Sequence, residues 1–155
     1  MIEFMIANKA DIQELTNIRI EYMDEAFNII SDDDRKRLNV ELPIFFKKNL
    51  GDKCVAFVAK DNETIVACAL LIIIEKPNSP VLKSGLVGEA MGVFTKPKYR
   101  NQGIATTLMR NMIQFAEIRG FDRIDLDASA NGAGVYRKVG FNEKQTEYIS
   151  MRISL

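Results

Sequence analysis

The stretch VFTKPKYRNQGIATTLM, Val93 to Met109, joins a β-rich run to a helical pattern through a basic turn with one glycine. Apolar residues recur at helical spacing from Ile104 onward, so the turn lies at a helix N-terminus. Free backbone N–H groups and the positive end of the helix dipole favour an anion of phosphate size there. Gly103 lets a ligand approach the backbone, and Arg100 supplies a charge that pairs with phosphate. The alternative is that Gly103 only starts a helix.

Two common phosphate-binding motifs are absent from this stretch. No G-K-[ST] follows the glycine, as it would in a Walker loop, and no G-x-G-x-x-G precedes a helix. These absences argue against a magnesium-held triphosphate and against a nicotinamide dinucleotide. The turn therefore predicts a site for a different pyrophosphate-bearing ligand.

The rest of the chain predicts an α/β fold with a mixed, mostly antiparallel sheet of six to seven strands and about four helices. We expect strands over 2–7, 53–60, 63–74, 86–95 and 122–129, with closing strands over 141–145 and 147–155. Asp61 and Asn62 predict a hairpin turn, and Asn8 with Asp11 predicts a capping box before a helix. Pro43 is expected to break or kink a second helix that starts near Ser31. The connection from 95 to 122 should cross over between two parallel strands.

Composition limits the class of protein. A length of 155 residues with 47% hydrophobic residues suits one domain, residues 1–155. Lys and Arg number 21, as do Asp and Glu, so no global field favours nucleic acid or an anionic membrane as a partner. The chain has no histidine and only two cysteines, so we expect no metal site. Without a signal sequence or a long apolar run, the expected location is cytoplasmic.

Two motifs resemble one known family. The run R-N-Q-G-I-A, from Arg100 to Ala105, resembles the [RQ]-x-x-G-x-[GA] signature of the GCN5-related N-acetyltransferases (GNAT superfamily). The later run VYRKVGF, Val135 to Phe141, resembles the Tyr-x-x-x-Gly-Phe segment of that family. The resemblance implies a GNAT-like fold with a splayed parallel strand pair at the cofactor site. It also implies acetyl-CoA as co-substrate and direct transfer of the acetyl group to a primary amine.

The resemblance assigns a set of residues to acetyl-CoA. They are Met91, Val93, Thr95, Arg100, Asn101, Gln102, Gly103, Ile104, Ala105, Thr106, Ser129 and Asn131. The backbone N–H of Val93 is the expected donor to the thioester carbonyl. Many family members carry an asparagine where Ser129 stands here, so the choice between Ser129 and Asn131 stays open.

Two residues are catalytic candidates. By the resemblance, Tyr136 protonates the departing CoA thiolate, and the similar pKa values of phenol and thiol make this transfer feasible. Strand alternation places Val87, Glu89, Met91 and Val93 on one face, which puts a carboxylate in an apolar stripe. Partial burial would raise the pKa of Glu89 and make it a base for the amine. The alternatives are a core tyrosine and an exposed glutamate.

The acceptor is expected between the first helices and the closing strands. Five acidic residues there favour a cationic amine such as a polyamine, an aminoglycoside or a lysine side chain, unless they only cap helices. They are Asp24, Glu25, Asp32, Asp33 and Asp34.

Two functions compete with acetyl transfer. One is a non-catalytic acyl-CoA-binding regulatory module, and the other is a generic nucleotide-binding interaction domain. The joint presence of Tyr136 and Glu89 favours catalysis. A homodimer formed through the closing strands is permitted by the sequence, which does not establish it.

Overall fold

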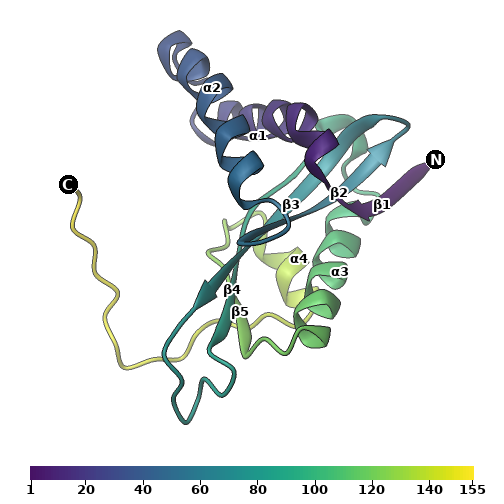
Figure 1. Cartoon of the computed structure of the whole chain (residues 1–155). Coiled ribbons are helices and arrows are strands. Elements are labelled where there is room, and N and C mark those ends of the chain that lie inside the picture. The colour runs from purple at the N-terminus through teal and green to yellow at the C-terminus, as the bar shows by residue number, and fades with distance from the viewer.

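A five-stranded sheet separates two layers of helices in the computed structural model, which describes residues 1–155 (Figure 1). The strands are β1 (Ile2–Ile6), β2 (Cys54–Asp61), β3 (Thr64–Glu75), β4 (Leu86–Thr95) and β5 (Arg123–Asp125), in that order across the sheet. The helices are α1 (Ile12–Ala26), α2 (Asp32–Asn49), α3 (Ile104–Ile118) and α4 (Ala133–Lys138), with short 3-10 turns at Lys9–Asp11 and Pro97–Tyr99. The first three strand pairs are antiparallel and β4/β5 is parallel, which confirms a mixed, mostly antiparallel sheet.

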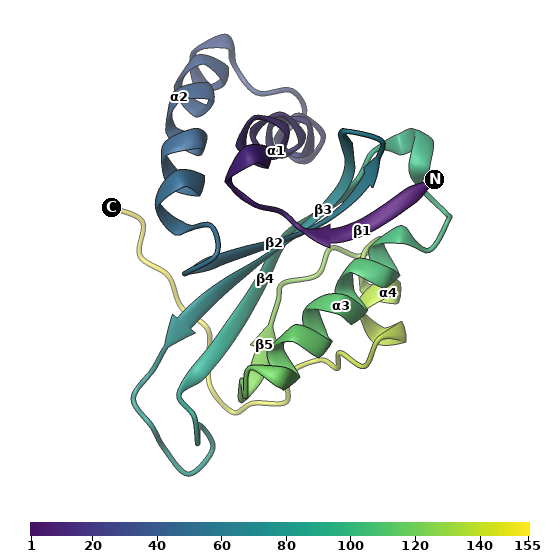
Figure 2. The same ribbon diagram turned by 45° about the vertical axis from the view of Figure 1, so that its right-hand side comes forward.

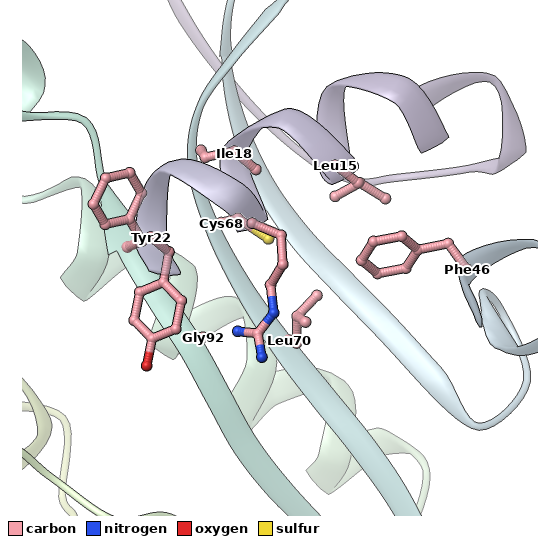
Figure 3. A pocket seen from close by; sticks show the side chains of 9 residues that line it. Leu15, Ile18, Tyr22, Phe46, Cys68, Leu70 and Gly92 are labelled. Atoms are coloured by element: carbon pink, nitrogen blue, oxygen red, sulfur yellow. The ribbon is translucent and has the colours of Figure 1, made fainter. Parts of the chain in front are cut away.

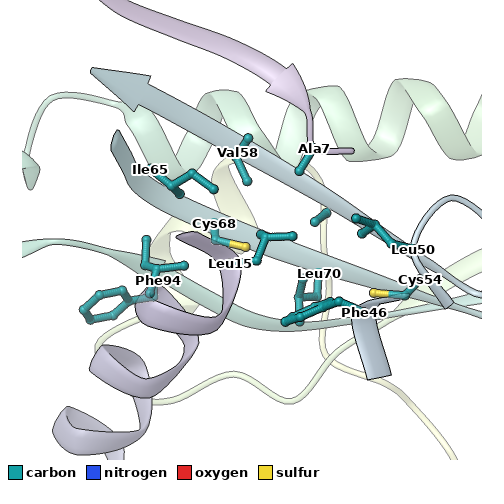
Figure 4. Close-up of a cluster of buried hydrophobic side chains, with 12 residues drawn as sticks. Ala7, Leu15, Phe46, Leu50, Cys54, Val58, Ile65, Cys68, Leu70 and Phe94 are labelled. Atoms are coloured by element: carbon teal, nitrogen blue, oxygen red, sulfur yellow. The ribbon is translucent and has the colours of Figure 1, made fainter. Parts of the chain in front are cut away.

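The core has two halves, one on each face of the sheet. Helices α1 and α2 cover one face, while α3 and α4 cover the other (Figure 2). Leu15 and Ile18 of α1 and Phe46 of α2 are buried in the first cluster (Figure 4), and Leu108 and Met112 of α3 are buried in the second. The apolar side of α1 therefore packs against the sheet. Burial of each such side chain contributes about 1.5–3 kcal/mol.

The hairpin of β2 and β3 lies between both helical layers. Because both faces of these strands are covered, their sequences are continuous apolar runs rather than alternating ones. Cys54 and Cys68 are free thiols within the hairpin. Burial raises the pKa of Cys54 to about 11 and that of Cys68 to about 12, so both thiols stay neutral core groups. The capping box predicted at Asn8 and Asp11 is also present.

Three expectations about the elements need correction. Of the break or kink expected at Pro43, the break is absent: α2 continues through Pro43 to Asn49, and Phe46 beyond the proline is buried in the core. The strand β5 covers only three residues of the expected 122–129. The two closing strands are absent, so the sheet has five strands rather than six or seven. Residues 142–155 lead away from the sheet and find no strand to pair with (Figure 1).

A β-bulge interrupts β4. Leu70 pairs with Met91 and Cys68 with Phe94, so two residues of β4, Gly92 and Val93, face one residue of β3. Gly92 has φ +59°, a left-handed conformation that glycine adopts without steric cost. After the bulge the faces change: Met91 packs against the first cluster, whereas Val93 packs against the second. The predicted alternation that put Met91 and Val93 on one face is therefore wrong.

Candidate functional site

The turn from β4 into α3 presents a row of free backbone donors. Asn101 and Gly103 both have left-handed backbone, with φ of +61° and +76°, and α3 begins at Ile104. The six backbone N–H groups of residues 101–106 donate to no acceptor within the protein. Successive unpaired N–H groups at a helix N-terminus form a concave site for an anion. The structure thus places the predicted residues Asn101 to Thr106 together in this anion cradle, residues 101–106.

Arg100 is exposed, but its guanidinium is held by contacts within the protein. Its Nε donates to the carbonyl oxygen of Thr95 at 2.8 Å, and its Nη2 pairs with the carboxylate of Glu25 on α1. The guanidinium also lies 5.5 Å from the centre of the Phe94 ring. These contacts tie the turn to α1 and to the end of β4. The phosphate contact expected of Arg100 stays a prediction.

The edge of β4 nearest the anion cradle has no neighbouring strand. Parallel pairing with β5 ends at Glu89 and Asp125, yet β4 continues for six residues to Thr95. The predicted cofactor residues Met91, Val93 and Thr95 all lie in this unpaired part of β4. Polar backbone groups on that side are available to a ligand.

Tyr136 lies on α4, on the face of the sheet that carries α3. Its ring packs edge-to-face against Phe141, with centroids 6.1 Å apart, and its hydroxyl has no hydrogen-bond partner within the protein. Burial, with a smaller contribution from Tyr22, raises the pKa of the Tyr136 hydroxyl. The phenol is therefore held in its proton-donating form.

The two candidates that precede α4 differ in their contacts. The Oγ of Ser129 accepts a hydrogen bond from the Gly132 N–H at 3.1 Å, just before α4. Ser129 thus stabilises the start of the helix that carries Tyr136. Asn131 is exposed, and its side chain makes no hydrogen bond within the protein.

Glu89 is exposed and makes no ion pair. The expectation of partial burial in an apolar stripe is therefore wrong. Glu89 pairs in register with Asp125 of β5, the short strand at which the sheet ends. Burial of the Glu89 carboxylate therefore does not support its predicted role as a base.

Arg19 was missed by the sequence analysis. It comes from the buried side of α1, and its Nη1 is buried without a hydrogen-bond partner. Its guanidinium carbon lies 5.0 Å from the ring centre of Tyr22, and a side chain at Gly92 would collide with its Nη1. Burial lowers the pKa of Arg19. The signal in the sequence was an arginine between Ile18 and Ile20, inside the apolar pattern of α1.

The guanidinium of Arg19 lines a small pocket against the β4 bulge (Figure 3). Apolar side chains of Leu15, Leu70 and Phe94 form most of the wall, and no carboxylate belongs to it. A buried cation without a counter-ion is costly in free energy, and such groups cluster at functional sites. The pocket therefore marks the β4 bulge as the place where the unpartnered cation of α1 meets β4.

The acidic residues predicted to attract a cationic acceptor are mostly paired. The Oδ1 of Asp24 lies 2.7 Å from the Nη2 of Arg35, and the Oδ1 of Asp34 lies 3.0 Å from the Nη2 of Arg37. Glu25 pairs with Arg100, while Asp32 and Asp33 lie in the first turn of α2. These contacts favour the alternative of ion pairs and helix caps.

Two further features are absent from the structure. Histidine, cysteine and acidic side chains nowhere gather in a group of three able to hold a metal ion. None of the helices combines the length and apolar character needed to cross a bilayer.

Comparison with known proteins decides the family. The model of the Acetyltransferase (GNAT) family matches residues 12–141, a span that runs from α1 past α4. The chain belongs to the GNAT family. The match includes both motifs and the anion cradle between β4 and α3.

Relatives of this GNAT protein include proteins of known sequence and of known structure. An uncharacterized N-acetyltransferase of Methanocaldococcus jannaschii is 31% identical over 104 residues, which is 65% of this chain and 40% of that protein. A predicted acetyltransferase of Clostridium acetobutylicum, whose structure was solved with acetyl-CoA, is 29% identical to this chain. The two structures superpose with a TM-score of 0.84, and the match covers 98% of this chain and 96% of the clostridial chain. An aminoglycoside acetyltransferase from a soil metagenome shares the fold, with 18% identity, a TM-score of 0.72, and coverage of 99% and 97%.

Proposed function

We propose that residues 1–155 form a single N-acetyltransferase domain that moves the acetyl group of acetyl-CoA to a primary amine by direct attack. The observation that carries the proposal is the row of six unpartnered N–H groups at residues 101–106. Membership of the GNAT family supports it, as does the similarity to a clostridial acetyltransferase solved with acetyl-CoA.

The anion cradle suits the pyrophosphate of acetyl-CoA, because its donors converge at the positive end of α3. The pantetheine arm then follows the free edge of β4 past Met91 and Val93, where pairing with β5 has ended. We expect the two strands to splay at this place. Asn131 is the better candidate for a contact with this arm, since the Ser129 hydroxyl oxygen accepts the Gly132 N–H.

Acetyl-CoA supplies an acetyl thioester, whose C–S bond breaks as the neutral amine forms a C–N bond with the carbonyl carbon. The N–H of Val93, aimed by the bulge, donates to the carbonyl oxygen as negative charge develops on it. Tyr136 gives its phenolic proton to the departing thiolate, and solvent restores that proton. Glu89 accepts the proton lost by the amine through water, which fits its exposed position.

A calorimetric titration with acetyl-CoA tests the proposal, with ADP and NAD as control ligands. Selective binding of acetyl-CoA is the expected result. Equal binding of ADP would favour a generic nucleotide-binding domain, and no binding at all would refute the anion cradle. Release of CoA in the presence of amines then separates an enzyme from a non-catalytic acyl-CoA-binding module.

Arg19 defines the acceptor side of the proposal. Its unpartnered guanidinium faces the bulge beside the proposed oxyanion donor. A buried cation there repels a second cation, so polyamines are poor candidates. An amine with a carboxylate or amide oxygen nearby would satisfy the free Nη1. We therefore expect amino acids or peptide amines to react faster than polyamines in a panel assayed by CoA release.

Replacing Arg19 with methionine is expected to separate stability from activity. Methionine fills the same apolar pocket without a buried charge, so the free energy of unfolding should stay equal or rise by about 1 kcal/mol. The KM for the acceptor should rise by about tenfold or more, with acetyl-CoA affinity unchanged. Thermal unfolding measures the stability, calorimetry the affinity for acetyl-CoA, and steady-state kinetics the KM for the acceptor.

The matched control for Arg19 is Arg37→Met. Arg37 is an exposed arginine of α2, paired with Asp34 and Glu41, far from the bulge in the sequence. That variant should leave the acceptor KM unchanged. A loss of stability in Arg19→Met without any change in acceptor KM would make Arg19 a packing residue only.

Glu89→Gln is expected to slow turnover chiefly at low pH, where the amine is protonated and most needs a base. Loss of a general base costs about 10²–10⁴-fold in rate when the base is essential. The pH profile of kcat for Glu89→Gln measures this effect. The control variant is Glu63→Gln, in the turn between β2 and β3. Matching profiles for parent and Glu89→Gln would remove Glu89 from the mechanism.

A further inference from the structure

Two ion pairs join the C-terminal half of α1 to the turn between β4 and α3. The Oε1 of Glu21 lies 3.2 Å from the Nζ of Lys96, and the Oε2 of Glu25 lies 2.5 Å from the Nη2 of Arg100. Both glutamates and both basic residues are four positions apart, so the pairs form two successive rungs along the helix. Only the second rung reaches the residue directly before the anion cradle.

The last turns of α1 depend on such polar contacts. Burial of the helix ends at Ile20, and every later residue of α1 is partly or largely exposed. Beyond the helix, Asn28 and Ile29 have left-handed backbone, with φ of +55° and +68°. That conformation is strained for a β-branched residue, and the Ile29 side chain is 74% exposed. The Glu25 contact therefore anchors the end of α1, where no side chain is buried.

The guanidinium of Arg100 faces two competing anions. Its Nε donates to the carbonyl oxygen of Thr95, and its Nη2 donates to the carboxylate of Glu25. A pyrophosphate in the anion cradle brings its own negative charge next to the same side chain. Guanidinium forms charge-assisted hydrogen bonds to phosphate and to carboxylate alike, and the two anions repel each other. Glu25 thus holds donors of Arg100 that a phosphate group would also take.

We propose that Glu25 is an autoinhibitory contact, which competes with the pyrophosphate of acetyl-CoA for Arg100, so that cofactor binding releases the end of α1. The inference rests on the proposed function and links its two substrate sites, because α1 also carries Arg19. Linkage is reciprocal, so the factor by which Glu25 weakens acetyl-CoA binding equals the factor by which acetyl-CoA loosens α1. For an exposed ion pair this factor is about two- to fivefold.

Calorimetry with acetyl-CoA on two matched variants tests the competition. Glu25→Gln keeps the shape of the side chain and removes its charge, so it should bind acetyl-CoA about two- to fivefold more tightly than the parent. The control Glu21→Gln removes the same charge one turn earlier on α1. Because its partner Lys96 lies outside the anion cradle, this variant should bind acetyl-CoA as the parent does.

The variant Arg100→Met shows whether the effect of Glu25 passes through Arg100. It should weaken acetyl-CoA binding, and adding Glu25→Gln to it should change the affinity no further. A gain of affinity in the double variant would make Glu25 a general negative charge and would overturn the proposal. So would weaker binding in Glu25→Gln alone, which would mean that Glu25 holds Arg100 toward the phosphate. Unchanged binding would reduce the ion pair to a structural contact.

Hydrogen exchange measures the release of α1 directly. The N–H groups of Phe27 and Ile29 donate to the carbonyl oxygens of Met23 and Asp24, and that of Ile30 donates to the Asp24 carboxylate. These three amides should exchange about two- to fivefold faster in the parent once acetyl-CoA is bound. In Glu25→Gln they should exchange fast with and without acetyl-CoA. Slower exchange on binding would contradict the release.

Failure of this inference is distinct from failure of the proposed function. A parent that binds no acetyl-CoA would refute the proposed function and the competition together. A parent that binds acetyl-CoA, with Glu25→Gln binding it equally well, would refute the competition alone.

Discussion

Gly103→Val is expected to weaken acetyl-CoA binding by at least about tenfold, or roughly 1.4 kcal/mol. Gly103 has φ +76°, and a Cβ at this position would meet no protein atom within 4 Å. The added side chain therefore projects into the open space at the row of free N–H groups, where the pyrophosphate is proposed to lie. Calorimetry with acetyl-CoA measures the loss of affinity.

The valine also strains the backbone, and Gly120→Val controls for this. Gly120 follows the other end of α3 with φ +73°, and a Cβ there likewise has no atom within 4 Å. Both variants carry a left-handed residue at a cost of about 1–2 kcal/mol, so their free energies of unfolding should fall alike. Only Gly103→Val should lose affinity. Equal affinities in the two variants would mean that the turn does not contact the cofactor.

The anion cradle was predictable because its chemistry is local. A glycine between a strand and an apolar helical repeat fixes both the left-handed turn and the direction of α3. The turn and the helix direction together align the free backbone N–H groups at the start of the helix. The hairpin at Asp61 and Asn62 and the capping box at Asn8 are equally local, and both are present. Signals that span only a few residues survive tertiary packing.

The position of Glu89 was not predictable in the same way. Its expected burial rested on alternation along the strand, which shows which face a side chain shares but not how far the helices cover that face. The face of Val93 depended on a bulge that follows from one left-handed residue, Gly92. A glycine inside a strand pattern indicates either a bulge or a close approach of a ligand, and the pattern alone does not separate the two.

Arg19 and the C-terminal segment illustrate a different limit. An arginine within an apolar helical face is normally expected to extend its charge to water. Only the fold shows that Nη1 ends against the β4 bulge, buried and without a hydrogen-bond partner, in a pocket that no carboxylate lines. Likewise, alternation predicted a strand over 147–155, but a strand pattern does not specify which strand it pairs with.

Tyr136→Phe is expected to lower kcat by about 10²-fold or more, with acetyl-CoA affinity and stability nearly unchanged. The Tyr136 hydroxyl has no hydrogen-bond partner within the protein, so phenylalanine keeps the packing against Phe141 and loses only the proton donor. Tyr99→Phe should behave in the opposite way. It breaks a 2.8 Å hydrogen bond to Asp61, which costs about 1 kcal/mol of stability, and leaves kcat intact.

The pH dependence of the parent enzyme gives the Tyr136 prediction a second test. Burial raises the pKa of the Tyr136 hydroxyl, so the donor stays protonated as pH rises beyond the range where an exposed tyrosine ionises. Activity of the parent should therefore persist into alkaline solution and fall only as the phenol ionises. The phenylalanine variant, which has no proton to lose there, should lack this alkaline fall while remaining slow at every pH. Full activity in Tyr136→Phe, or an alkaline fall shared by both proteins, would make Tyr136 a packing residue and assign the thiolate's proton to solvent.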